Sequence, residues 1–237
     1  MVAELEVEVP DVALAVYAHP DDADVACAGT LARWAAAGSQ VHLLVCTDGG
    51  RGTTDPRTDP LELAERRAAE VAASARLVGL ASHHNLAYAD GELDDGPAFR
   101  AQLVGWIRRL GPDAVIGHDP TAVFFGEHYF NHRDHRAAGW ALLDAVAPAA
   151  AQPHYFPDAG PAHQVRSVYL TGTLEPNVWV DVTGTIDVKV SAVECHRSQM
   201  AEGAEWAREV VRARAEEEGR RAGTAFAEGF RRLQLAV

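Results

Sequence analysis

Short apolar runs alternate with helix-like segments in the first part of the chain. The run from Val12 to Ala18 is too short for a helix and lies between polar and proline positions, which predicts a buried β-strand. Residues 24–37 have a helical composition, and Gly38 supplies a stop at their C-terminal end. Residues 41–46 (VHLLVC) predict a second strand. The chain therefore begins with strand, helix and strand.

The same alternation continues along the rest of the chain. The pattern predicts helices over 61–77, 99–109, 134–147, 186–195 and 202–221, and extended runs over 84–87, 114–117, 167–171 and 178–182. Alternating strands and helices favour parallel strands joined by crossover helices, because parallel neighbours need a long return connection. We therefore predict an α/β fold, a Rossmann-like three-layer sandwich with a mostly parallel sheet. No domain boundary or internal repeat is visible, so residues 1–237 are expected to form a single domain.

Charge and composition exclude two classes of partner. The 237 residues carry a formal net charge of −13 without a cluster of Lys or Arg, so the positive surface that nucleic-acid binding requires is missing. No apolar run approaches the roughly 20 residues that cross a bilayer, and the first ten residues are too acidic for a signal peptide. Three widely spaced cysteines fit reduced, buried thiols. We expect a cytoplasmic protein without membrane insertion, and the sequence leaves homo-oligomer formation open.

Two histidine-containing clusters follow predicted strands. In parallel sheets, sites form at the carboxyl ends of the strands, which here are the loops 19–24, 47–58 and 118–131. His19 and Asp22 lie three residues apart in the first loop, and His132 and His135 have the same spacing just after the last. This spacing brings side chains to one face of a helical turn. A nitrogen and an oxygen from the first cluster plus a nitrogen from the second would form a three-ligand zinc site with a fourth position for water.

Asp21 is the acid of the first cluster that this ligand set leaves unassigned. A carboxylate beside the metal but not bound to it can take a proton from zinc-bound water, whose pKa the metal lowers to about 7. The alternative is a simple turn, in which Pro20 fixes φ and Asp22 or Asp24 caps the following helix. Two clusters at one edge of the sheet favour the catalytic interpretation.

The second cluster has its own alternatives. The segment His132-Arg133-Asp134-His135 is also typical of an exposed, polar helix entry. Arg133 points away from the face shared by the two histidines, so we expect it to be solvated. Asp134 is a candidate for orienting a neighbouring histidine through a hydrogen bond.

Several motifs in one order give the chain a family resemblance. They are AHPDD at 18–22 with Gly29-Thr30-Leu31, CTDGGRG at 46–52, Arg67-x-x-Glu70 before Leu80, His118-Asp119-Pro120, NHRDHRAAG at 131–139, VDVTGTID at 180–187 and His196-Arg197-Ser198-Gln199. With these motifs the chain resembles the LmbE-like, or PIG-L, zinc deacetylases, which remove acetyl from N-acetylglucosamine-type substrates.

The resemblance implies a role for each residue of the two clusters. His19, Asp22 and His135 would bind one Zn²⁺ per chain, and Asp21 would be the general base. His132 would stabilise the oxyanion or protonate the leaving amine, which suits an imidazole near neutral pH. Iron, cobalt or manganese would also suit such a ligand set.

Three further residues are expected to contact substrate. Arg67 matches a family position suited to holding sugar hydroxyls, although an ion pair with Glu70 one turn later explains it equally well. Asp90 is a candidate contact, and Asp-Gly is also a simple turn signal. Phe130 stands where some members have tyrosine, and with its neighbours Phe124 and Phe125 it would form a specificity wall.

The sequence thus predicts a zinc-dependent hydrolase that removes acetyl from an N-acetylated amino sugar or a related glycoside, a small-molecule substrate. One alternative is an amidase for a larger acyl group or a thiol-conjugate amide. Another is a catalytically silent Rossmann-like binding protein. Against the latter, no Gly-x-Gly-x-x-Gly follows the first strand, so the dinucleotide phosphate loop is missing.

Overall fold

A seven-stranded sheet forms the centre of the protein, whose computed structural model describes residues 4–200 and 204–235. Its strands, in spatial order, are β3 (Ser82–Tyr88), β2 (Gln40–Thr47), β1 (Val12–Tyr17), β4 (Ala114–His118), β7 (Ser167–Thr171), β9 (Ala227–Gln234) and β8 (Val178–Asp181). A separate hairpin consists of β5 (Phe124–Phe125) and β6 (Tyr129–Phe130).

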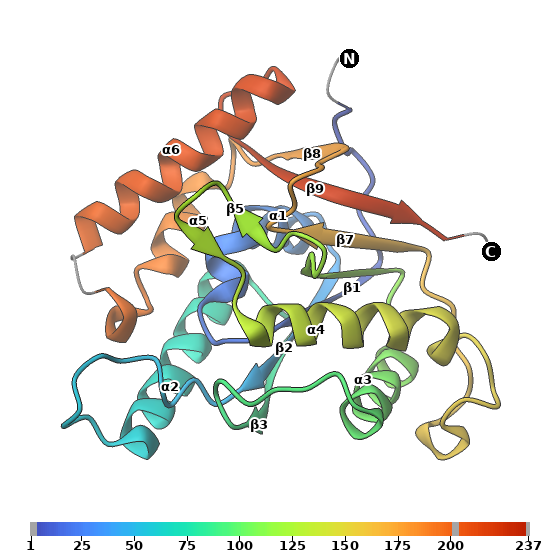
Figure 1. Cartoon of the computed structure of the whole chain (residues 1–237). Helices are drawn as coiled ribbons and strands as arrows, with labels where there is room; N and C mark the ends of the chain where they lie inside the picture. The colour runs from blue at the N-terminus through green and yellow to red at the C-terminus, as the bar shows by residue number, and fades with distance from the viewer. Residues whose placement is uncertain (1–3, 201–203, 236–237) are drawn as a thin grey trace.

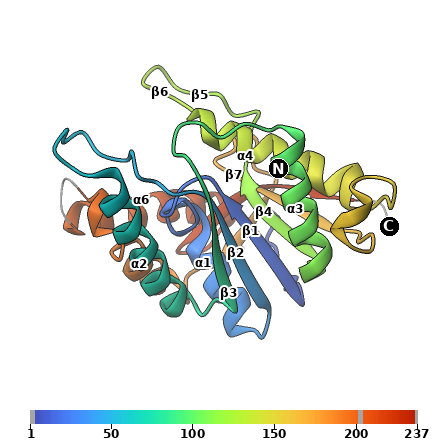
Figure 2. The same cartoon turned by 90° about the horizontal axis from the view of Figure 1, so that it is seen from below.

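Helices cover both faces of the sheet (Figures 1 and 2). They are α1 (Asp22–Ala36), α2 (Pro60–Val78), α3 (Pro97–Leu110), α4 (Arg133–Asp144), α5 (Ile186–Val193) and α6 (Ala204–Ala222), with short turns η1 (Ala145–Ala150), η2 (Pro157–Ala159) and η3 (Arg197–Gln199). Alternate side chains of β1 face opposite sides, because strand residues have a period of two. Ala13, Ala15 and Tyr17 join the apolar core under α1 and α2, and Leu14 and Val16 join the core under α3 and α4.

The order of the strands creates a switch point beside β1. Strand β1 pairs in parallel with β2 on one side and β4 on the other, and β3 and β7 extend the two sides in parallel. Only β9 runs antiparallel to its neighbours β7 and β8 within the described part of this sheet. The expected α/β fold with a mostly parallel sheet is therefore confirmed, and ligand sites of such sheets lie where the strand order reverses.

The C-terminal part differs from the predicted pattern. The sequence predicts two closing helices, but the last of them ends at Ala222 and the chain returns as strand β9 between β7 and β8. The predicted start of that helix at Glu202 lies outside the described residues. The helix predicted over 134–147 ends at Asp144, and a π-helical turn containing Pro148 follows. Among residues 4–200 and 204–235, every helix is too short or too polar to span a bilayer.

Candidate metal centre and active site

The first cluster lies at the carboxyl end of β1, directly at the switch point. His19 follows the strand, and α1 begins at Asp22. The Asp22 carboxylate folds back over this turn, because its Oδ2 accepts the backbone N–H of His19 at 2.7 Å. The start of α1 therefore brings the imidazole of His19 and the carboxylate of Asp22 to one point.

Three side chains meet there, two from the turn between β1 and α1 and its first helical residue, and one from the first turn of α4. His19 Nδ1 lies 3.3 Å from Asp22 Oδ2 and 3.1 Å from His135 Nε2, and His135 Nε2 lies 3.2 Å from Asp22 Oδ1. Ligands at 2.0–2.1 Å from a tetrahedral zinc are separated by about 3.3 Å. The two nitrogens and the carboxylate therefore have the chemistry and the spacing of a zinc ligand set.

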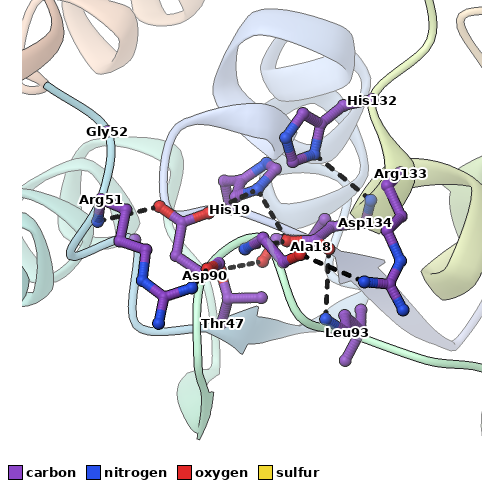
Figure 3. Close-up of polar contacts among 12 residues, drawn as sticks. Ala18, His19, Thr47, Arg51, Gly52, Asp90, Leu93, His132, Arg133 and Asp134 are labelled. Atoms are coloured by element: carbon purple, nitrogen blue, oxygen red, sulfur yellow. Dashed lines mark hydrogen bonds and ion pairs between the residues drawn. The ribbon is translucent and has the colours of Figure 1, made fainter. Parts of the chain in front are cut away.

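The remaining nitrogen of each imidazole faces a fixed oxygen. His135 Nδ1 lies 3.0 Å from Asn131 Oδ1. His19 Nε2 lies 3.2 Å from Asp90 Oδ1 and 3.4 Å from Asp134 Oδ2, and Figure 3 shows the ring flanked by these two acids. An imidazole that donates to an oxygen from one nitrogen presents the lone pair of the other to a metal. The histidine that the Asp134 carboxylate faces is therefore His19.

The electrostatics of the cluster favour a cation. Burial opposes a charge on His19, but Asp22, followed by Asp134 and Asp90, raises its pKa to about 12. Burial also opposes the charge on Asp22, but His135, His118 and His19 hold its pKa well below the usual range. The described residues contain three overlapping sets of donors within 4.8 Å of one another: His19, His132 and His135; Asp22, His118 and His135; and His19, Asp90 and Asp134.

His118 is a member of this cluster to which the sequence patterns assign no role. It ends β4 beside β1, and its Nε2 lies 3.2 Å from Asp22 Oδ2 and 3.2 Å from the backbone nitrogen of Ala18. Its ring stacks on His135 with centroids 4.1 Å apart and planes 11° apart. Burial lowers the pKa of His118 to about 4, so it is neutral near pH 7. The sequence feature that indicates a role for His118 is its position directly after the predicted strand 114–117.

Asp21 lies between the cluster of His19, Asp22 and His135 and a cavity. Its carboxylate is 26% exposed, and Oδ1 accepts a hydrogen bond of 2.7 Å from Arg67 Nη2. A cavity of about 1090 Å³ begins at Asp21, Asp22 and His135 and continues past the hairpin to α6. Asp21 therefore combines a fixed position with access to a ligand.

His132 lies beside the ligand set. Its ring centroid is 4.8 Å from that of His19 and 5.5 Å from that of His135. Its Nδ1 accepts the backbone N–H of Asp134 at 3.2 Å, which Figure 3 shows. Burial lowers the pKa of His132, so the neutral form predominates near pH 7. A neutral ring that accepts at Nδ1 carries its proton on Nε2, where it can be donated.

The three predicted substrate contacts lie away from the described lining of this cavity. Arg67 is 2% exposed and bonded to Asp21, and Asp90 is 7% exposed behind His19. Phe130 is 67% exposed and pairs with Phe124 across the hairpin. Because successive strand residues face opposite sides, the other side of the hairpin carries the pair Phe125 and Tyr129, and this pair lines the cavity.

Comparison with known proteins adds a family match. The family model described as PIG-L, GlcNAc-PI de-N-acetylase, matches residues 14–146. The diacetylchitobiose deacetylase of Thermococcus kodakarensis is 34% identical over 92% of this chain and 81% of its own length. A 1D-myo-inositol 2-acetamido-2-deoxy-alpha-D-glucopyranoside deacetylase of Saccharopolyspora erythraea is 32% identical over 65% of this chain and 62% of its own. The solved N,N'-diacetylchitobiose deacetylase of Pyrococcus horikoshii superimposes with a TM-score of 0.87 and 30% identity, covering 95% of this chain and 84% of that one.

Proposed function

Because the chain belongs to the PIG-L family, we propose that it is a metal-dependent N-deacetylase that hydrolyses the acetamide of an N-acetylated amino sugar or a related glycoside. The observation that carries this proposal is the meeting of His19, Asp22 and His135 within 3.3 Å of one another beside a cavity that also exposes Asp21. Metal-dependent amide hydrolysis needs a site for the metal, a base and room for the substrate, and all three have candidates here.

The ligand set fits zinc best. Two imidazole nitrogens and one carboxylate oxygen are a common set for catalytic zinc, and the separations of 3.1–3.3 Å suit its tetrahedral geometry. When bound, zinc polarises the acetamido carbonyl and lowers the pKa of a water molecule to about 7. Other divalent ions suit the same donors, so the metal itself is part of the proposal.

Asp21 is the proposed general base. Arg67 holds one carboxylate oxygen of Asp21, and the side chain remains partly exposed to the cavity. A carboxylate in this position takes a proton from the attacking water and can return it to the leaving amine. Asp22 is unsuited to this role, because both of its oxygens face the imidazoles of the ligand set.

His132 is the proposed stabiliser of negative charge on the former carbonyl oxygen. Its neutral ring has the proton on Nε2, because Nδ1 accepts from Asp134 N–H. A fixed N–H donor stabilises an oxyanion at the moment it forms. Asp134 supports this indirectly, since its backbone orients His132 while its carboxylate orients His19.

The test is acetate release by the metal-loaded protein. We would assay N-acetylglucosamine, diacetylchitobiose and the acetamidoglucosyl inositol substrate named for its relatives, together with amides of larger acyl groups and thiol conjugates. We expect acetate from at least one acetamido sugar, with activity lost after chelation and recovered with Zn²⁺. Cleavage of the larger amides alone would show an amidase instead, and failure on every acetamido sugar would contradict the proposal.

A further inference from the structure

The cavity beside the cluster of His19, Asp22 and His135 is larger than one acetamido sugar requires. Its volume is about 1090 Å³, whereas pockets that enclose a complete drug-sized ligand have roughly 300–1,000 Å³. An acetamide at the metal ligands would occupy only the end of the cavity where Asp21, Asp22 and His135 lie. In a 2-acetamido sugar the acetamide is next to the anomeric carbon, so the group on the anomeric oxygen, the aglycone, lies close to it. The outer part of the cavity is therefore placed to take the aglycone.

Apolar side chains from three separate segments line this cavity and remain open to solvent. Val25 in the first turn of α1 is 39% exposed, Tyr129 of the hairpin is 53% exposed, and Leu174 between β7 and β8 is 58% exposed. Large apolar side chains that gather at one exposed place mark a site for a ligand or a partner. Because these three side chains line the same cavity as Asp21, a substrate that reaches Asp21 can cover them.

The charged side chains in the outer part of the cavity are mostly paired within the chain. The pairs are Lys189 with Glu228, Arg220 with Glu217, and Arg221 with Glu218. Glu218 also accepts a hydrogen bond of 2.6 Å from Trp179 Nε1. Arg214 is exposed on α6, where its guanidinium can stay hydrated. A second sugar ring would need free partners for its hydroxyls, so this lining favours a ligand that binds through apolar area.

The outer wall comes from a later part of the chain than the metal ligands. The family model matches residues 14–146, which include His19, Asp22 and His135. Leu174 and helix α6 lie beyond residue 146. A substitution at Leu174 therefore changes the outer part of the cavity without changing the segment that supplies the metal ligands.

We propose that the outer part of the cavity, at Val25, Tyr129 and Leu174, is a subsite for an apolar aglycone, an alkyl or aryl group on the anomeric oxygen of the acetamido sugar. This inference rests on the proposed function, because the acetamide at the metal ligands sets the direction of the aglycone. It deepens that function by naming the chemical class of the substrate beyond the sugar ring.

The first test compares glycosides of N-acetylglucosamine that differ only in the aglycone. We would measure acetate release from the methyl glycoside, the hexyl glycoside below its micelle concentration, and diacetylchitobiose. Each buried methylene group is worth roughly fourfold in binding, so KM for the hexyl glycoside should be about 10- to 100-fold below that for the methyl glycoside. The kcat values should agree within about twofold, because the chain binds equally before and during the reaction. Equal KM values, or a KM for diacetylchitobiose below that for the hexyl glycoside, would overturn the inference.

Two pairs of variants locate the subsite. Leu174→Ser is matched by Leu61→Ser, which changes a 75% exposed leucine on α2 outside the described lining. Tyr129→Ser is matched by Phe130→Ser on the opposite side of the hairpin. Leu174→Ser and Tyr129→Ser should each raise KM for the hexyl glycoside roughly fivefold and leave the methyl glycoside within about twofold. The two control variants should behave as the wild type, and an unchanged KM in both test variants would contradict the proposed subsite.

Sedimentation of the same variants tests the other possible occupant, a second copy of the chain. We expect the oligomeric state of wild type to be retained in Leu174→Ser and Tyr129→Ser. Dissociation of an oligomer by these two changes, but not by Leu61→Ser, would assign the apolar side chains to a contact between copies and overturn the inference.

Calorimetry with glucosides separates this inference from the proposed function. Hexyl and methyl glucoside lack an acetamide, so their binding does not depend on deacetylation. We expect hexyl glucoside to bind at least about tenfold more tightly, with a negative heat-capacity change that Leu174→Ser reduces. If wild type releases no acetate from any acetamido sugar, the proposed function fails, and this binding decides the subsite. Equal binding of the two glucosides would refute the subsite even in an active deacetylase.

Discussion

Two clusters of charged side chains contact α1, one at Asp22 and the other at Thr30, and their polar atoms are satisfied in different ways. Glu228 on β9 accepts from Lys189 at 2.5 Å and from the backbone and hydroxyl of Thr30 at 2.7 and 2.5 Å, so each oxygen has a matching donor. In the cluster of His19, Asp22 and His135, His19 Nδ1 and His135 Nε2 face each other at 3.1 Å. The other nitrogen of each ring faces an oxygen, of Asp90 and of Asn131 respectively. The Glu228 cluster is complete within the chain, whereas the donor atoms of His19, Asp22 and His135 form a group that could hold a metal ion. This difference separates a structural cluster from a functional one.

The largest expected effect is the loss of metal binding in Asp22→Ala. Removing this carboxylate takes away both oxygens, Oδ2 facing His19 and Oδ1 facing His135. Zinc affinity should fall by more than the roughly 10- to 100-fold caused by losing a residue that only orients a ligand. Titration of the metal-free protein with buffered zinc measures it, with Asp158→Ala at an exposed position as control. An affinity equal to that of wild type would remove Asp22 from the ligand set.

The complementary change is Lys189→Met in the satisfied cluster. It leaves Glu228 charged and buried without its cation, which should lower the free energy of unfolding by about 3–5 kcal/mol. Urea denaturation measures the loss, and the double variant Lys189→Met/Glu228→Gln should recover part of it. Zinc affinity should be unchanged. If Lys189→Met lost zinc binding but kept its stability, the cluster of Glu228 and Lys189 would not be structural, and the contrast between the two clusters would be wrong.

A smaller effect is expected from Asn131→Ala. Its Oδ1 lies 3.0 Å from His135 Nδ1 and fixes the direction of that ring. Without it, zinc affinity should fall roughly 10- to 100-fold, because the ligand is present but poorly oriented. The same zinc titration measures this change. Unaltered affinity would show that stacking on His118 alone orients His135.

The smallest expected effect is a pH dependence of stability at His196. Burial opposes its charge, but the hydrogen bond and charge of Asp24 raise its pKa above the ordinary 6.5. A raised pKa contributes stability that is complete below pH 6.5 and is lost as the pH rises through the folded-state value. The destabilisation caused by His196→Gln should therefore be larger at pH 6 than at pH 9 in urea denaturation. Equal values would show that His196 stays neutral.

Local patterns predict the start of the chain well and its end poorly. The strand β1 and helix α1 follow from a short apolar run and a helical segment that neighbour each other, and the sites follow from the loop between them. Strand β9 has the sequence AEGFRRLQ, which lacks an apolar alternation. Its buried Glu228 accepts hydrogen bonds from Thr30, and its charge is paired with Lys189, 39 positions earlier in the chain. The sequence of β9 alone does not reveal Lys189, because that partner lies on another element.

The same limit applies within the site. The spacing of His19 and Asp22 is visible because both lie in one turn. His118 has no spacing signal, since its contact with Asp22 spans 96 positions and depends on β1 pairing with β4. The hydrogen bond from Arg67 to Asp21 likewise spans 46 positions and is not visible in the local sequence. Residue types therefore predict the chemistry, and tertiary contacts decide which residue performs each part.

The most direct test of the proposed mechanism is the Asp21→Asn variant, assayed for metal content and for acetate release side by side. Asparagine keeps the size of the side chain and removes its ability to take a proton. We expect close to one zinc per chain, as in wild type, with turnover lowered by roughly 10²- to 10⁴-fold. Turnover within about tenfold of wild type, with zinc retained, would contradict Asp21 as the base.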